Sequence, residues 1–139
     1  MIKRTFFSFS VLGLAVHGVA WACSCAMITS SPEELFQDNN VVFYGEVLSV
    51  VEPISLGCSG VQSSADPIDV QFEVIEGYKG ADDGETLKFT TARGGASCGV
   101  AFEEGETWLI YTSSDNLNLC DPSVRVEDDD ADLDVLREL

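Results

Sequence analysis

The stretch VVFYGEVLSVVE, residues 41–52, decides the fold that the sequence predicts. Its β-branched and aromatic residues are typical of a strand. Gly45 interrupts it, and a glycine inside a strand indicates a bulge or a sharp bend, a common device where a strand coils round a small barrel. We therefore expect a strand with a bulge or a sharp bend at Gly45.

The residues that follow predict further strands. Residues 68–74 alternate apolar and polar side chains, the pattern of a half-buried strand. Similar signals place strands at residues 68–80, 85–92, 100–102 and 107–113. These are too few strands for two packed sheets, so we expect a mainly β chain with a small antiparallel barrel of about five strands.

One short helix is expected before the barrel strands in the sequence, and another after them. Ser31 can cap the first helix, Pro32 suits its first position, and Glu34 completes a capping box. The acidic C-terminal segment, from about residue 127, predicts a second helix with Leu133, Leu136 and Leu139 on its apolar side. Asp128, Asp130 and Asp132 have the spacing of a calcium loop, but leucines stand where that loop needs its glycine and its glutamate, so we expect no calcium site.

The N-terminus predicts export. Lys3 and Arg4 precede an apolar segment, and Ala20-Trp21-Ala22 matches a cleavage signature, so residues 1–22 are interpreted as a signal peptide. No later apolar run predicts a transmembrane segment. We expect cleavage before Cys23 and a secreted or periplasmic protein. The alternative is a lipoprotein acylated at Cys23, which Ala20 and the bulky Trp21 fit poorly.

Residues 23–139 form the expected single domain of 117 residues. Loss of residues 1–22 lowers the number of basic residues from 7 to 5, against 24 acidic ones, which gives a formal charge of −19. Nucleic acid and anionic membranes would repel such a chain. A basic partner fits the charge, and so does a simple need for solubility, which we favour.

Cleavage also removes His17, the one histidine. Catalytic arrangements that need histidine, and histidine-based zinc or haem sites, are then excluded. We therefore expect no enzyme, no catalytic residues and no cofactor.

All five cysteines remain after cleavage, and in an exported chain widely spaced cysteines normally form disulfides. Their number is odd, so at least one is left over. The C-x-C pair at Cys23 and Cys25 is open to several interpretations: a soft-metal ligand pair, a lipid anchor, part of a disulfide framework, or the functional end of the molecule.

The order of motifs resembles a known family. Cys23-Ser24-Cys25 precedes the first helix, and the remaining motifs are NNVVFYGEVLSV (39–50), FEVIEGYKG (72–80), SCGVAFEEGETWLIY (97–111) and LNLCDPS (117–123). This set is similar to the inhibitory domain of tissue inhibitors of metalloproteinases (TIMPs), in the netrin-like (NTR) group. The resemblance runs from Cys23 to about Cys120 and implies an OB-fold-like barrel.

The resemblance also implies the disulfide pairs and the residues that would contact a protease. It pairs Cys23 with Cys98 and Cys25 with Cys120, which leaves Cys58 unpaired. In the family, the α-amino and carbonyl groups of the first residue, here Cys23, chelate the catalytic zinc of a metalloprotease, and the second residue, here Ser24, points toward the primary specificity pocket. Residues 53–67 and 92–97 would flank them as secondary contacts. Apart from the resemblance, Arg93 beside Gly94-Gly95 is expected to be an exposed contact residue. The family's third bridge has no counterpart here.

Two other functions stay open. A non-inhibitory NTR-type module that binds a protein partner would have the same barrel and bridges. A metal-binding protein would use Cys23 and Cys25 as thiolates, which requires reduced cysteines.

Overall fold

The computed structural model describes residues 23, 25, 30–52, 66–93, 97–127 and 131–139; the predicted signal peptide lies outside them. Two short helices and six strands make up the described chain. They are α1 (Pro32–Asp38), β1 (Val41–Val51), β2 (Pro67–Lys79), β3 (Thr86–Ala92), β4 (Thr107–Thr112), β5 (Asn116–Leu117), β6 (Val124–Arg125) and α2 (Ala131–Arg137).

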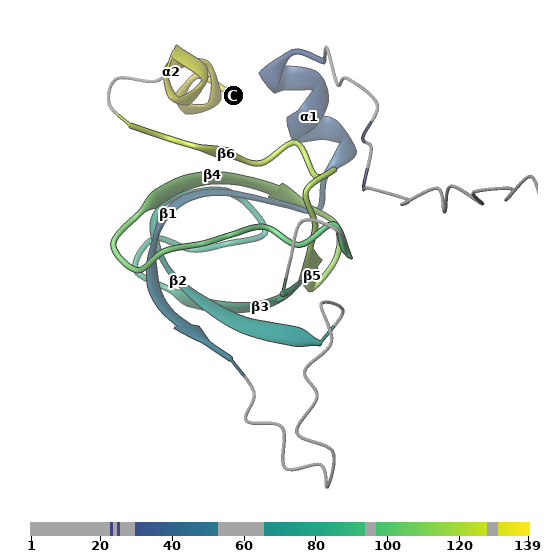
Figure 1. Cartoon of the computed structure of the whole chain (residues 1–139). Helices are drawn as coiled ribbons and strands as arrows, with labels where there is room; N and C mark the ends of the chain where they lie inside the picture. The colour runs from purple at the N-terminus through teal and green to yellow at the C-terminus, as the bar shows by residue number, and fades with distance from the viewer. Residues whose placement is uncertain (1–22, 24, 26–29, 53–65, 94–96, 128–130) are drawn as a thin grey trace, which may run out of the picture.

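All six strands belong to one sheet, in the order β5-β3-β2-β1-β4-β6. Neighbouring strands are antiparallel except for β3 and β5, which run parallel. Figure 1 shows the sheet curled around an interior, with both helices outside it on the side of β4 and β6. The predicted fold class, mainly β with a barrel-like sheet and two short helices, is confirmed. Two of the six strands, β5 and β6, have only two residues each.

The bulge or bend predicted at Gly45 corresponds to an irregularity in the pairing of β1 with β2. The register between β1 and β2 shifts between Tyr44 and Gly45. A Cβ atom at Gly45 would lie 2.6 Å from the carbonyl oxygen of Glu73 on β2, so a side chain there would collide with the backbone of the neighbouring strand. Because β1 pairs with both β2 and β4, this irregularity lies in the middle of the sheet.

The larger core fills the interior of the curl. Phe72 is fully buried, and its ring meets those of Phe43, Phe89 and Phe102 at centroid distances of 5.6, 6.0 and 5.3 Å. Trp108 packs edge-to-face on Phe102 at 4.8 Å. Aromatic pairs in such geometry add to the free energy gained from burial alone. The strands are therefore held together by their inward-facing rings.

A second core lies on the outer face of β1 and β4, beneath α2. Leu109 and Tyr111 of β4 pack there with Leu133 and Leu136 of α2. The prediction that Leu139 shares this apolar side is wrong, since Leu139 is 61% exposed. The reason is that α2 ends at Arg137, two residues before Leu139, so the helix does not carry Leu139 onto the sheet.

Helix α1 begins as predicted. Ser31 and Glu34 form the capping box, and Pro32 occupies the first turn. Its C-terminal end is fastened to the barrel by Lys79 at the end of β2, whose Nζ donates hydrogen bonds to the carbonyl oxygens of Phe36 and Gln37 at 2.8 and 3.1 Å. A cation near the last carbonyls of a helix is favourable, so this contact fixes α1 against the sheet.

The strand predicted at residues 100–102 is wrong, because these residues form no ladder with a neighbouring strand. The backbone N–H of Val100 instead donates to Oγ1 of Thr91 at 2.9 Å, and Phe102 is buried in the interior core. The apolar alternation in this segment reflects core packing by an irregular chain.

Candidate functional site

Two disulfides fasten the start of the described chain to the barrel. One joins Cys23 to Cys98 with a Cα–Cα distance of 5.3 Å, and the other joins Cys25 to Cys120 with a Cα–Cα distance of 5.1 Å. These are the pairs that the family resemblance implies. We call the four cysteines and their two bonds the clamp.

The loop that carries Cys98 is shaped by its immediate neighbours. Cys98 has a φ of 61°, in the left-handed region that side-chain-bearing residues rarely adopt. Gly99 is buried so closely against β3 that a Cβ atom there would lie 1.8 Å from the carbonyl oxygen of Ala92. Together with the bond from Val100 to Thr91, this contact holds Cys98 at the end of β3.

The loop that carries Cys120 is a tight turn built by two polar side chains. The backbone N–H of Asn118 donates to Oδ2 of Asp121 at 2.7 Å. The backbone N–H of Cys120 donates to Oδ1 of Asn118 at 2.8 Å. The backbone N–H of Asp121 donates to the carbonyl of Asn118 at 3.0 Å. Side chains of this type stabilise turns by such local bonds. We did not predict this turn, although the order Asn-x-Cys-Asp was a signal that could have indicated it.

The two loops are also joined to each other. The backbone N–H of Leu119 donates to the carbonyl oxygen of Cys98 at 2.7 Å. Cys23 and Cys25 are only two residues apart, so the two disulfides are neighbours, with the Sγ atoms of Cys23, Cys25 and Cys120 all within 4.8 Å of one another. The clamp is thus one compact cluster rather than two separate anchors.

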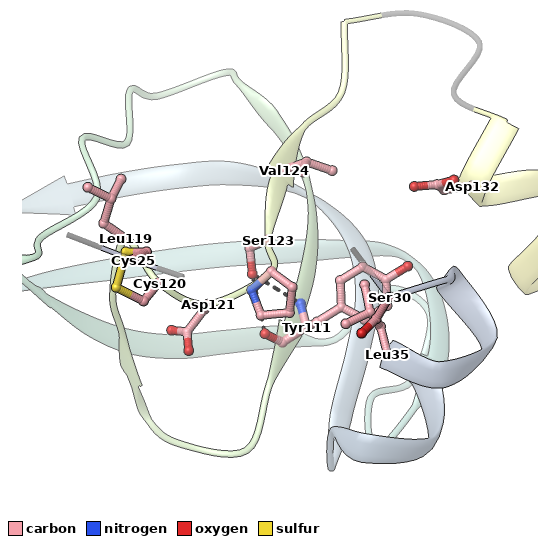
Figure 2. A pocket seen from close by; sticks show the side chains of 11 residues that line it. Cys25, Ser30, Leu35, Tyr111, Leu119, Cys120, Asp121, Ser123, Val124 and Asp132 are labelled. Carbon is pink, nitrogen blue, oxygen red and sulfur yellow. Dashed lines mark hydrogen bonds between the residues drawn. A yellow bond between two sulfur atoms is a disulfide. The ribbon is translucent and has the colours of Figure 1, made fainter. Parts of the chain in front are cut away.

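A groove of about 410 Å³ lies beside the Cys25–Cys120 bond. Figure 2 shows Leu119 and Asp121 next to this disulfide, with Tyr111, Leu35 and Asp132 further along the groove. A hydrogen bond from the backbone N–H of Tyr111 to Oγ of Ser123, at 3.1 Å, ties the groove's middle to β4. Leu119 is 51% exposed, so the clamp has an apolar side chain and a carboxylate at its edge.

The structure places the other predicted site residues as follows. Ser24 and Cys58 lie outside the described residues, as do 53–65 and 94–96 of the expected flanking loops. The prediction that Arg93 is an exposed contact is wrong. Its side chain is only 19% exposed, and its Nη2 lies 3.2 Å from Oε2 of Glu52, because the end of β3 lies near the end of β1.

The structure bears differently on the thiolate metal site and on the calcium loop. The sulfur atoms that could act as thiolate ligands are in disulfide bonds, and a disulfide sulfur is not a thiolate. For the calcium loop, Asp128 and Asp130 lie outside the described residues, and Asp132 is in the first turn of α2.

None of the helices in the described part of the chain is long and apolar enough to cross a membrane. The sequence matches no protein-family model and no curated protein.

Proposed function

We propose that this chain is an exported, TIMP-like inhibitor of zinc metalloendopeptidases. Removal of residues 1–22 creates a new α-amino group on Cys23. This amine and the carbonyl oxygen of Cys23 then chelate the catalytic zinc of the protease, while Ser24 points toward its primary specificity pocket. The inhibitor has no catalytic residues and no metal of its own, since the zinc belongs to the protease.

One observation carries the proposal: both Cys23 and Cys25 are bonded to the barrel through neighbouring disulfides. A chain terminus normally moves freely, and ordering it on a partner costs conformational entropy. Two covalent anchors within three residues remove most of that cost before binding. The anchors are themselves set in loops that hydrogen bonds hold in place, so the position of Cys23 is fixed in advance.

The chemistry of the terminus suits a catalytic zinc ion. Such an ion keeps one coordination position for water, which a neutral amine can displace. An α-amino group has a pKa of about 8, so a useful fraction is neutral near pH 7. Cys23 is half-buried rather than fully covered.

A matched pair of variants tests the proposal. The chain that begins at Cys23 is compared with one that carries a single extra alanine before Cys23, and a version with an extra alanine after Leu139 is the control. Each is titrated against a panel of zinc endopeptidases. We expect the N-terminal alanine to weaken inhibition by on the order of 100-fold or more, because it replaces the amine by an amide, and the C-terminal alanine to change nothing.

Other results would overturn parts of the proposal. Equal inhibition by both extended versions would exclude chelation by the terminus. Binding to a protease without inhibition would favour the non-inhibitory NTR-type module. Mass spectrometry of the exported protein supplies a further check, since an acylated Cys23 would have neither the free amine nor the thiol for its bridge.

A further inference from the structure

The sulfur atoms of the two disulfides are close neighbours. The Sγ atoms of Cys25 and Cys120, which belong to one bond, lie within 4.8 Å of Sγ of Cys23, which belongs to the other. All four cysteines are half-buried rather than fully covered, and exchange depends on access to a sulfur. We propose that the clamp is a thiol–disulfide exchange site, where a dithiol reductant that opens one bond also opens the other by transfer between sulfurs.

The first step consumes the reductant. One of its thiolates attacks Sγ of Cys120, forms a mixed disulfide and releases Cys25 as a thiolate. Its second thiolate then closes on the first, which releases Cys120 as a thiolate and leaves the dithiol as an oxidised cyclic disulfide. The Cys25–Cys120 bond has gained the two electrons that the dithiol has lost.

The second step needs no further reductant. The Cys120 thiolate attacks Sγ of Cys23, so that a Cys23–Cys120 bond forms, the Cys23–Cys98 bond breaks, and Cys98 leaves as a thiolate. No electrons are gained or lost overall. Attack by Cys25 would give a Cys23–Cys25 bond in the same way.

The surrounding loops keep the reacting atoms together after the first bond opens. The bond from the Leu119 N–H to the Cys98 carbonyl does not depend on the disulfides, and neither does the turn that Asn118 and Asp121 build around Cys120. The Cys120 thiolate therefore stays next to its target, which gives it a high effective concentration. Cys120 is the better placed nucleophile because its loop is fixed on the barrel.

The exchange has a consequence for the terminus. A Cys23–Cys120 or Cys23–Cys25 bond holds Cys23 differently from the native pair, so one reducing event changes both anchors. That this would end inhibition rests on the proposed function, whereas the exchange itself does not.

The test follows the sulfur pairs without any protease. The oxidised protein carrying Cys58→Ser, which removes the fifth cysteine, receives one equivalent of a neutral dithiol in native buffer and in concentrated urea. Samples are quenched with acid, alkylated and mapped by mass spectrometry. We expect peptides linked through Cys23 and Cys120 to form about tenfold faster or more in native buffer than in urea. An equal or slower rate, or one-disulfide species with native pairs alone, would overturn the proposal.

A second test compares two variants and needs no reductant. Cys98→Ser, in the same background, leaves the Cys23 thiol beside the intact Cys25–Cys120 bond, so a fraction of the folded protein should contain a Cys23–Cys120 or Cys23–Cys25 link. The matched control, Cys23→Ser, removes the transferring sulfur and should contain the Cys25–Cys120 bond alone. Identical patterns for the two variants would also overturn the proposal. Because no inhibition is measured, its failure and that of the proposed function are read separately.

Discussion

The barrel interior and the clamp are held by different forces. In the interior, rings such as Phe43 and Phe72 are fully buried and contact one another. In the clamp, the cysteines are half-buried and two covalent bonds replace extensive packing. The comparison indicates that the fold and the candidate site can be disturbed separately: the barrel by removing apolar volume, and the clamp by reduction.

The largest effect is expected from Phe72→Ala. This change removes a ring that contacts three others and leaves a cavity at the centre of the interior core. We expect the free energy of unfolding to fall by about 3–5 kcal/mol. Urea denaturation followed by fluorescence and circular dichroism measures it.

Ile75→Ala on the same strand is the control for Phe72→Ala. Ile75 is 42% exposed, so its loss should cost less than about 0.5 kcal/mol. A cost below about 1 kcal/mol for Phe72→Ala would mean that the interior packing does not hold the sheet together.

The double change Cys25→Ser and Cys120→Ser tests the clamp side of the comparison. These residues are separated by 95 positions, and removing the bond frees a long loop in the unfolded chain. We expect a loss of about 2–4 kcal/mol in the free energy of unfolding. The circular dichroism of the folded barrel should stay unchanged, because its strands are paired and packed without this bond.

Cys58→Ser repeats the substitution outside the clamp and is the control. A double variant that is unfolded at 25 °C would break the comparison, because the barrel would then depend on the clamp. A double variant as stable as the parent would mean that the bond fixes the terminus without stabilising the fold.

The same contrast explains how much could be predicted from the sequence. The strands around Gly45 and the capping box at Ser31 were predictable because they follow local rules of spacing and residue type. Val100 and Phe102 misled the prediction, since an irregular segment that packs into a core has the same apolar alternation as a strand. The exposure of Leu139 depended on where α2 ends, which periodicity alone does not determine.

The candidate site was predictable in a different way. The cysteine pairs came from the resemblance, since chemistry alone leaves several pairings open for five cysteines. That the two disulfides lie near each other follows from the spacing of Cys23 and Cys25 once their pairs are known. The hydrogen bond between Leu119 and Cys98 could not be predicted, because it joins loops far apart in the sequence.

The smallest effect concerns α2, which an ion pair also attaches to the sheet. Arg137 donates through Nε and Nη2 to the two carboxylate oxygens of Glu76 on β2, at 2.8 and 2.6 Å. These hydrogen bonds hold the pKa of Glu76 below its ordinary value of 4.5. The lowered pKa means that the folded state prefers the ionised carboxylate, so this contribution to stability is complete above pH 4.5 and is lost as the pH falls through the lower, folded-state pKa.

Glu76→Gln removes this contribution and leaves the size of the side chain unchanged. Wild type should be slightly more stable than the variant at pH 7, and the difference should shrink as the pH falls below 4.5. We expect a small effect, because the Glu76 side chain is 33% exposed and water screens the pair. Urea midpoints at pH 7 and pH 3 measure it, with Glu73→Gln on the same strand as the control. A difference that does not change with pH would contradict the prediction. Since neither aromatic packing nor disulfides titrate in this range, a pH-dependent difference would separate the attachment of α2 from both the interior core and the clamp.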